Sequence, residues 1–91
     1  MRTEDVKLNQ VGEDYVNHPS HYANTRIECI DALEAMVEPY TDTIDATLSW
    51  QIVKYIWRHP FKWNALEDLK KARFYLNRLI NYYDSKLTNK E

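Results

Sequence analysis

The stretch TIDATLSWQIVKYIWRHP, which runs from Thr43 to Pro60, decides the fold. Its large apolar side chains recur at the three- and four-residue steps of an α-helix, and they cover more than one side of it. One face holds Ile44, Leu48, Ile52, Tyr55 and Ile56, and a second face holds Trp50, Val53 and Trp57. Because a helix that is apolar most of the way round belongs inside a protein, we predict a central buried helix over residues 43–58 that ends at His59 and Pro60.

The segments on both sides of this stretch also predict helices. Upstream, TRIE at residues 25–28 has the form of a capping box, so we expect a helix that starts at Thr25 and ends before Pro39. Downstream, Asn64 is followed three residues later by Glu67, which predicts another helix start. Apolar side chains of that helix recur at heptad spacing, which suits packing against an antiparallel helix or another subunit. This row consists of Leu69, Ala72, Leu76, Leu79 and Tyr83.

The order of these segments predicts an all-α protein with one domain. Residues 1–14 are polar and acidic and are expected to form a flexible arm. An extended segment should follow, because Pro19 disfavours helix at the residue before it. Residues 15–87 would then be a single helical domain, and residues 88–91 a tail. The predicted fold is a small bundle of three main helices with an extended N-terminal segment, assembled as an oligomer.

Composition and charge narrow the class of protein further. A single glycine and three prolines argue against a turn-rich β fold, and no run of eighteen apolar residues could span a membrane. The N-terminus lacks the apolar core of a signal peptide, and Cys29 is the single cysteine, so a reducing cytoplasm is expected. Residues 1–45 carry three basic and ten acidic side chains, whereas residues 46–91 carry nine basic and four acidic ones. This split favours a local anion site over a surface for long nucleic acid, although the two halves could also simply attract each other.

A polar stripe on the central helix is the strongest candidate site. Thr47, Gln51, Lys54 and Arg58 follow at steps of four, three and four, Lys62 comes next, and Asp68, Lys71, Tyr75 and Arg78 line up on the following helix. Arginine and lysine suit phosphate, so Lys54, Arg58, Lys62 and Lys71 are the predicted phosphate ligands. The rings of Tyr55, Trp57 and Trp63 could stack a base. The alternative is an exposed helix edge whose Lys54 and Arg58 pair with Glu67 or Asp68.

The histidines and carboxylates outside this stripe supply further candidates. His18, His21 and Tyr22 in HPSHY are expected to pin the extended segment or to contact a ligand. Glu28 and Asp31, one turn apart, could bind a metal together with Asp68, and Mg²⁺ would be the ion if the protein is an enzyme. The single glycine, Gly12, leaves no phosphate-cradling glycine loop, which excludes a P-loop kinase. No residue is assigned a catalytic role.

The ordered motifs VNHPSHY, IECID, KYIWR and, after Lys62, EDLKKARFYLNR resemble the SaV-like family of small bacteriophage proteins over residues 16–80. One branch of that family looks like a nucleotide kinase that lacks a P-loop and acts on deoxynucleoside monophosphates. The family's glycine-containing loop after the arginine is replaced here by HPFKW, and the glycine before IE by NTR. The polar residues that match the family pattern are His18, His21, Tyr22, Glu28, Asp31, Lys54, Tyr55, Arg58, Lys62, Asp68 and Lys71.

These observations and the resemblance lead to one expected function and two alternatives. The leading hypothesis is a phage-encoded protein, in the cytoplasm of an infected bacterial cell, that holds a phosphorylated nucleotide in a basic and aromatic pocket. It would sequester a signalling nucleotide and so counter a host defence, without chemistry. The first alternative is a P-loop-less deoxynucleoside monophosphate kinase that uses Mg²⁺. The second is a helical protein-interaction module that docks through the heptad row. The expected partners are the nucleotide and further copies of the chain, with no membrane.

Overall fold

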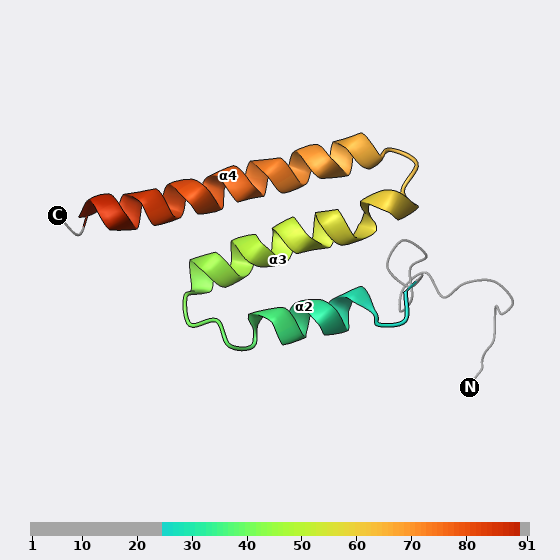
Figure 1. The fold of residues 1–91 in the computed structure, drawn as a ribbon, viewed down its shortest axis with the longest axis horizontal. Helices are drawn as coiled ribbons and strands as arrows, with labels where there is room; N and C mark the ends of the chain where they lie inside the picture. Colours follow the sequence, from blue (N-terminus) through green and yellow to red (C-terminus); the bar gives the residue numbers. More distant parts are fainter. Residues whose placement is uncertain (1–24, 90–91) are drawn as a thin grey trace, which may run out of the picture.

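The computed structural model describes residues 25–89, which form three α-helices and one turn of 3-10 helix. Helix α2 spans Cys29–Val37, α3 spans Thr43–Arg58, η1 spans His59–Phe61 and α4 spans Ala65–Asn89 (Figure 1). The part of the chain that is described contains no strand, so the all-α prediction is confirmed. The predicted arm of residues 1–14, the extended segment and the last two residues of the tail lie outside the described residues.

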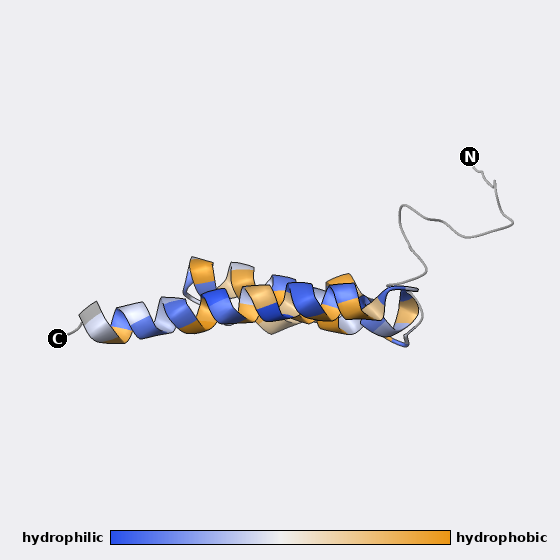
Figure 2. Cartoon of the chain, turned by 90° about the horizontal axis from the view of Figure 1, so that it is seen from above, coloured by the Kyte–Doolittle hydropathy of each residue, from blue (hydrophilic) through white to orange (hydrophobic). Residues whose placement is uncertain are grey.

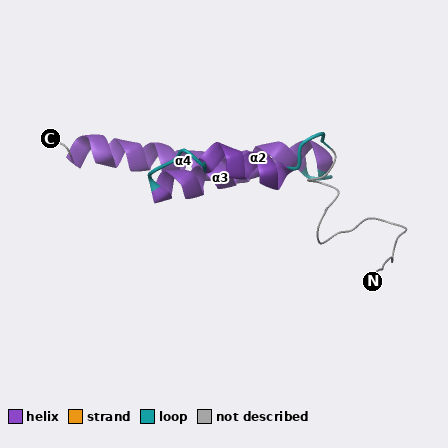
Figure 3. Ribbon diagram, turned by 90° about the horizontal axis from the view of Figure 1, so that it is seen from below, coloured by secondary structure: helices purple, strands orange, loops and turns teal. Residues whose placement is uncertain are grey.

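The three helices lie side by side in a single layer, with α3 between α2 and α4 (Figure 1). Both edge-on views show the same layer, one helix thick (Figures 2 and 3). Such a layer has two open faces, so little of it is covered: the fully buried hydrophobic residues are Cys29, Leu33 and Ala72. The prediction that α3 is buried nearly all round is therefore wrong for the single chain, in which Ile44 is 48% and Ile56 45% exposed.

Helix α3 has the predicted bounds because both of its ends are locally encoded. Asp42 is the N-cap, and its carboxylate accepts a hydrogen bond from the Asp45 N–H at 3.1 Å. Asp45 lies in the first turn and Arg58 in the last, so both charges suit the helix dipole. Pro60 then forces the tighter turn η1, which leads into α4.

Helix α2 begins four residues later than the capping box predicts. The Glu28 backbone is extended, with φ −69° and ψ 144°, and its side chain makes no capping hydrogen bond. The Thr25 hydroxyl donates to the Ile27 carbonyl instead of capping a helix. Cys29 and Leu33, one turn apart, are both buried, and α2 packs on α3. The prediction of a helix from Thr25 is thus wrong, because packing rather than the local cap motif sets where α2 starts.

Helix α4 begins as predicted, since the Asn64 side chain accepts a hydrogen bond from the Glu67 N–H at 3.2 Å. Its 25 residues make it about 37 Å long, so it extends past the 16-residue α3 at its C-terminal end (Figure 1). The row that packs on α3 consists of Asp68, Ala72, Tyr75, Leu79 and Tyr82. The predicted heptad row combined members of this packed row with Leu69, Leu76 and Tyr83, which are 38%, 44% and 43% exposed.

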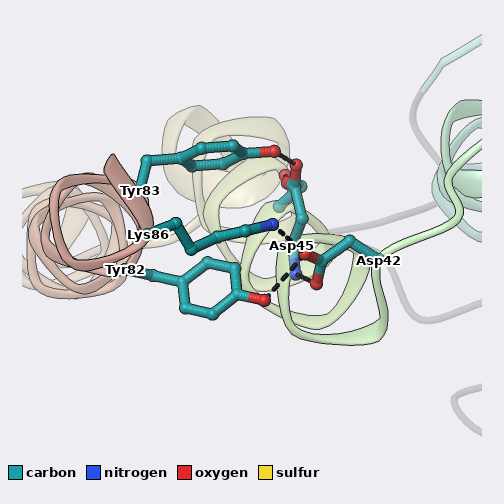
Figure 4. Close-up of polar contacts among 6 residues, drawn as sticks. Asp42, Asp45, Tyr82, Tyr83 and Lys86 are labelled. Atoms are coloured by element: carbon teal, nitrogen blue, oxygen red, sulfur yellow. Dashed lines mark hydrogen bonds and ion pairs between the residues drawn. The ribbon is translucent and has the colours of Figure 1, made fainter. Parts of the chain in front are cut away.

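A polar network fastens the C-terminal half of α4 to the start of α3 (Figure 4). The Asp42 carboxylate accepts hydrogen bonds from the Tyr82 hydroxyl at 2.7 Å and from Lys86 Nζ at 2.9 Å, and the Tyr83 hydroxyl donates to Asp45. The hydrogen bonds from Lys86 and Tyr82 hold the pKa of Asp42 well below its usual range. They also act on the donors, because the pKa of Lys86 and of Tyr82 is raised by the bond to Asp42. These contacts align the two long helices at the end opposite to η1.

The hydropathy of the helices bears on whether any of them could cross a membrane. Along residues 25–89, none of the helices combines the length and the apolar content that crossing a bilayer requires.

Candidate functional site

Three cationic side chains surround the ring of Tyr55 on α3. Lys54 Nζ lies 4.6 Å from the ring centroid, Arg58 Cζ 4.9 Å and Lys71 Nζ 5.5 Å. The ring also stacks on Tyr75 of α4, with centroids 6.0 Å apart and planes 6° from parallel. We call these five residues the Tyr55 cluster. Cation–π attraction gathers the three charges on one side of the α3/α4 contact, although like charges repel.

A carboxylate lies beneath the Tyr55 cluster. Asp68 is fully buried and accepts two hydrogen bonds from the Arg58 guanidinium, from Nε at 2.9 Å and from Nη2 at 3.2 Å. Burial raises the pKa of Asp68, but the hydrogen bond and charge of Arg58 and the charges of Lys62 and Lys71 outweigh it, so the net shift is downward. Asp68 is therefore ionised at neutral pH. One carboxylate among four cations leaves the surroundings positive.

Arg58 forms an ion pair within the fold and also belongs to the candidate site. Its paired hydrogen bonds to Asp68 correspond to the alternative interpretation of the polar stripe, in which Arg58 pairs with an acidic residue of the next helix. Its side chain is 14% exposed, so the guanidinium is held in a fixed position. A fixed arginine is pre-organised for an anion, because no ordering of the side chain is needed on binding. The two interpretations are therefore compatible.

The three rings predicted to stack a base differ in how exposed they are and in what contacts them. Trp63, in the loop between η1 and α4, is 94% exposed. Tyr55 has Tyr75 against its ring. Trp57 is half-buried, and its Nε1 atom is buried without a hydrogen-bond partner among the described residues. Of the three, Trp63 offers a ring that a base could stack on without moving another side chain. It directly follows Lys62, whose charge reaches Asp68.

The other predicted site residues lie on different elements of the fold or outside the described residues. Glu28 precedes α2 and Asp31 lies in its first turn, whereas Asp68 is on α4. Within residues 25–89 no three His, Cys, Asp or Glu side chains are grouped so that they could hold a metal ion. His18, His21 and Tyr22 lie outside the described residues, so their predicted contact with a ligand stays a prediction.

Lys54 also connects the Tyr55 cluster to α2. Burial raises the pKa of the Cys29 thiol, and the Lys54 charge lowers it by less, so the thiol stays protonated and acts as a packing group. The Lys54 charge therefore lies near the first residue of α2. One turn further back along α3, the Gln51 Oε1 atom is buried and has no hydrogen-bond partner among residues 25–89. It borders a hollow of about 240 Å³ that is lined by Val37, Ala46, Thr47, Trp50 and Gln51.

The sequence missed the part that Tyr75 takes in this arrangement. Tyr75 shares the spacing of Asp68 and Lys71, but the pattern does not show that its ring stacks on Tyr55. The sequence did contain a signal for this contact, because each of the two neighbouring helices carries a tyrosine close to a lysine: Tyr55 beside Lys54, and Tyr75 one turn after Lys71.

Comparison with known proteins gives one match. A family model described as a protein of unknown function (DUF3310) matches residues 16–77, which include α2, α3, η1 and the first half of α4. The matched range contains the whole Tyr55 cluster together with Asp68 and Trp63. Neither the comparison with curated proteins nor that with solved structures gives a match.

Proposed function

Because the chain belongs to the DUF3310 family, whose description states no function, we propose a function from the site itself. The protein binds a phosphorylated nucleotide at the Tyr55 cluster and holds it without converting it. Sequestration of a signalling nucleotide, the function expected from the sequence, requires tight binding and no chemical step. The observation that carries the proposal is the gathering of Lys54, Arg58 and Lys71 around one ring.

The charges of the cluster favour phosphate over other ligands. Lys54, Lys71 and Lys62 are half-buried rather than fully solvated, and like charges this close repel one another until an anion joins them. Asp68 neutralises a single charge and is already bound by Arg58. A phosphate group brings between one and two negative charges and several acceptor oxygens, which suits the remaining ammonium groups.

The aromatic residues favour a nucleotide over inorganic phosphate. Trp63 exposes 94% of its surface one residue after Lys62, so its ring is open to a base next to a phosphate ligand. In the proposed complex the phosphate lies among the lysines and the base stacks on Trp63. Base stacking on an aromatic side chain accepts any base, so this contact sets affinity rather than base identity.

Binding without turnover is favoured over phosphoryl transfer by the state of Asp68. A kinase needs carboxylates that can hold Mg²⁺ between two substrates. Asp68 has no exposed surface, and both of its oxygens accept hydrogen bonds from Arg58. It is therefore not placed to hold Mg²⁺.

Self-association with further copies of the chain, which the sequence also led us to expect, stays a proposal. It does not have to involve the Tyr55 cluster, because one chain supplies all five of its residues.

The proposal is tested by calorimetric titration of the purified full chain with mono-, tri- and cyclic nucleotides, in parallel with inorganic phosphate. Lys71→Ala and Lys54→Ala should each weaken nucleotide binding at least about tenfold, because each removes a charged hydrogen-bond donor. Lys70→Ala is the matched control. It removes an exposed lysine of the same helix, next to Lys71, and should leave the affinity unchanged.

Two results would contradict this function. If no nucleotide binds, or if Lys70→Ala weakens binding as much as Lys71→Ala, the cluster is not the site. The nucleotide recovered after incubation with ATP and Mg²⁺ should be unaltered. A deoxynucleoside monophosphate converted to its diphosphate would replace sequestration by a kinase activity.

A further inference from the structure

Helix α4 carries a second heptad row that the described residues leave partly exposed. Leu66, Leu69, Leu76, Ile80, Tyr83 and Leu87 are between 38% and 64% exposed. Together with Arg73 they follow at steps of three and four along the whole helix. We call these seven residues the α4 row. Hydrophobic segments recur along the full length of α4 when it is viewed from its outer edge (Figure 2).

The α4 row is distinct from the row that packs on α3. The packed row, from Asp68 to Tyr82, lies one position away on the same helix. Two adjacent heptad rows are typical of a helix that packs between two neighbours, and α3 supplies one of them. On the helical wheel, Lys71 and the α4 row lie on opposite flanks of the packed row. The Tyr55 cluster and the α4 row therefore belong to opposite open faces of the layer.

The size of the open row is that of a protein interface. If each side chain presents on the order of 200 Å² when fully exposed, the α4 row leaves on the order of 600 Å² uncovered. A stable interface takes about 800 Å² from each partner, and the neighbouring Ile56 of α3, 45% exposed, adds to the apolar surface. Isolated exposed apolar residues are common, but six of them in one heptad row along a single helix are not.

The charges beside the α4 row select a second copy of the chain as its partner. Lys70, Asn77 and Asp84 are spaced seven residues apart, so they occupy the same flank in three successive heptads. In an antiparallel pair with a twofold axis near Asn77, Lys70 of each copy faces Asp84 of the other. In a parallel pair these positions lie on opposite sides of the seam, so Lys70 and Asp84 would face Ala65 and Leu79 of the other copy and have no opposite charge to pair with.

We propose that two copies of this protein pair through the α4 row in this antiparallel register. The apolar contacts then complement one another: Leu69 lies opposite Leu87 of the second copy, and Leu76 opposite Ile80. Arg73, the one charged member of the row, lies opposite the Tyr83 ring of the second copy, where a cation–π contact accommodates its charge. The dimer is two layers thick, and each layer keeps its Tyr55 cluster on the outer face.

The dimer is tested by light scattering coupled to size exclusion on the full chain at about 100 µM, with helix content checked by circular dichroism. Ile80→Lys should give a monomer that keeps its helices, because Ile80 is half exposed in the single chain and does not support its fold. Phe74→Lys is the matched control. It changes an apolar residue of α4 that is 56% exposed and lies outside the row, and it should remain dimeric.

A charge exchange tests the orientation. Lys70→Glu or Asp84→Lys alone places like charges in contact twice per dimer, and should raise the dimer dissociation constant about tenfold. The double variant should restore the wild-type value. A monomeric wild type, or an Ile80→Lys variant that stays dimeric, would overturn the proposed interface. Failure of the double variant to restore pairing would overturn the antiparallel register. None of these outcomes depends on nucleotide binding, which is measured separately on Ile80→Lys.

Discussion

Removing the carboxylate charge of Asp68 should unfold this protein more readily than any change on its surface. Asp68 is fully buried and accepts two hydrogen bonds from Arg58, at 2.9 and 3.2 Å. Asp68→Asn keeps the size of the side chain but removes the carboxylate charge that Arg58 contacts beside Lys62 and Lys71. Breaking a buried pair in this way costs about 3–5 kcal/mol. Since Arg58 is 14% exposed and keeps some contact with water, we expect about 3 kcal/mol.

The measurement is urea unfolding followed by circular dichroism at a fixed protein concentration, since self-association would make stability depend on concentration. For a domain of this size, a loss of about 3 kcal/mol lowers Tm by more than about 10 °C. Glu67→Gln, one residue earlier and exposed, is the control and should change the free energy of unfolding by less than about 0.5 kcal/mol.

A double variant separates the loss of the whole pair from the removal of one of its two partners. Arg58→Met combined with Asp68→Leu replaces both partners by apolar side chains, and should be within about 1 kcal/mol of the wild type. If Asp68→Asn alone were as stable as the wild type, the reasoning that Arg58 needs this carboxylate would be refuted. Arg58 would then be better described as a ligand-binding residue only.

Three further outcomes follow from the structure. Acid should destabilise the fold, because the pKa values of Asp42 and Asp68 are lower in the folded protein than in the unfolded chain. Their contribution to stability is therefore present above about pH 4, the pKa of an unfolded aspartate, and is lost as the pH falls below it. In unfolding curves measured over a pH series, Asp42→Asn should reduce the loss of stability at acid pH. Trp63→Ala should leave Tm unchanged, because the side chain is 94% exposed, yet weaken nucleotide binding about tenfold in calorimetry through lost stacking. Asn64→Ala should lower the free energy of unfolding by about 1 kcal/mol through loss of the cap on Glu67, whereas Asn64→Asp should retain it.

Local signals in the sequence were sufficient for α3 and for the start of α4. Asp42 caps α3, Pro60 ends it and Asn64 caps α4, and each acts on the backbone within a few residues. The capping box at Thr25 is an equally local signal, but it failed. Glu28 takes an extended backbone so that Cys29 and Leu33 can be buried against α3, and this long-range packing overrides a cap worth about 1 kcal/mol.

The candidate site could be predicted as a set of residues but not as a geometry. Helical spacing alone places Lys54 and Arg58 on one stripe and Asp68 and Lys71 on another. Which carboxylate Arg58 contacts depends on how α3 and α4 are set against each other, and the turn η1 decides that. In the same way, heptad spacing identified α4 as a packing helix, but only the structure separates the row that meets α3 from the open α4 row.

The single-layer arrangement has a consequence for how the chain folds. Each α-helix packs chiefly on the one next to it in the sequence, α2 on α3 and α3 on α4, through short connections. Contacts of this kind give a low relative contact order, so little loop-closure entropy opposes the formation of either helix pair. The single chain should therefore fold in microseconds to milliseconds, as small helical proteins do. Its folding rate should change little when the connection at residues 38–42 is lengthened by a few residues.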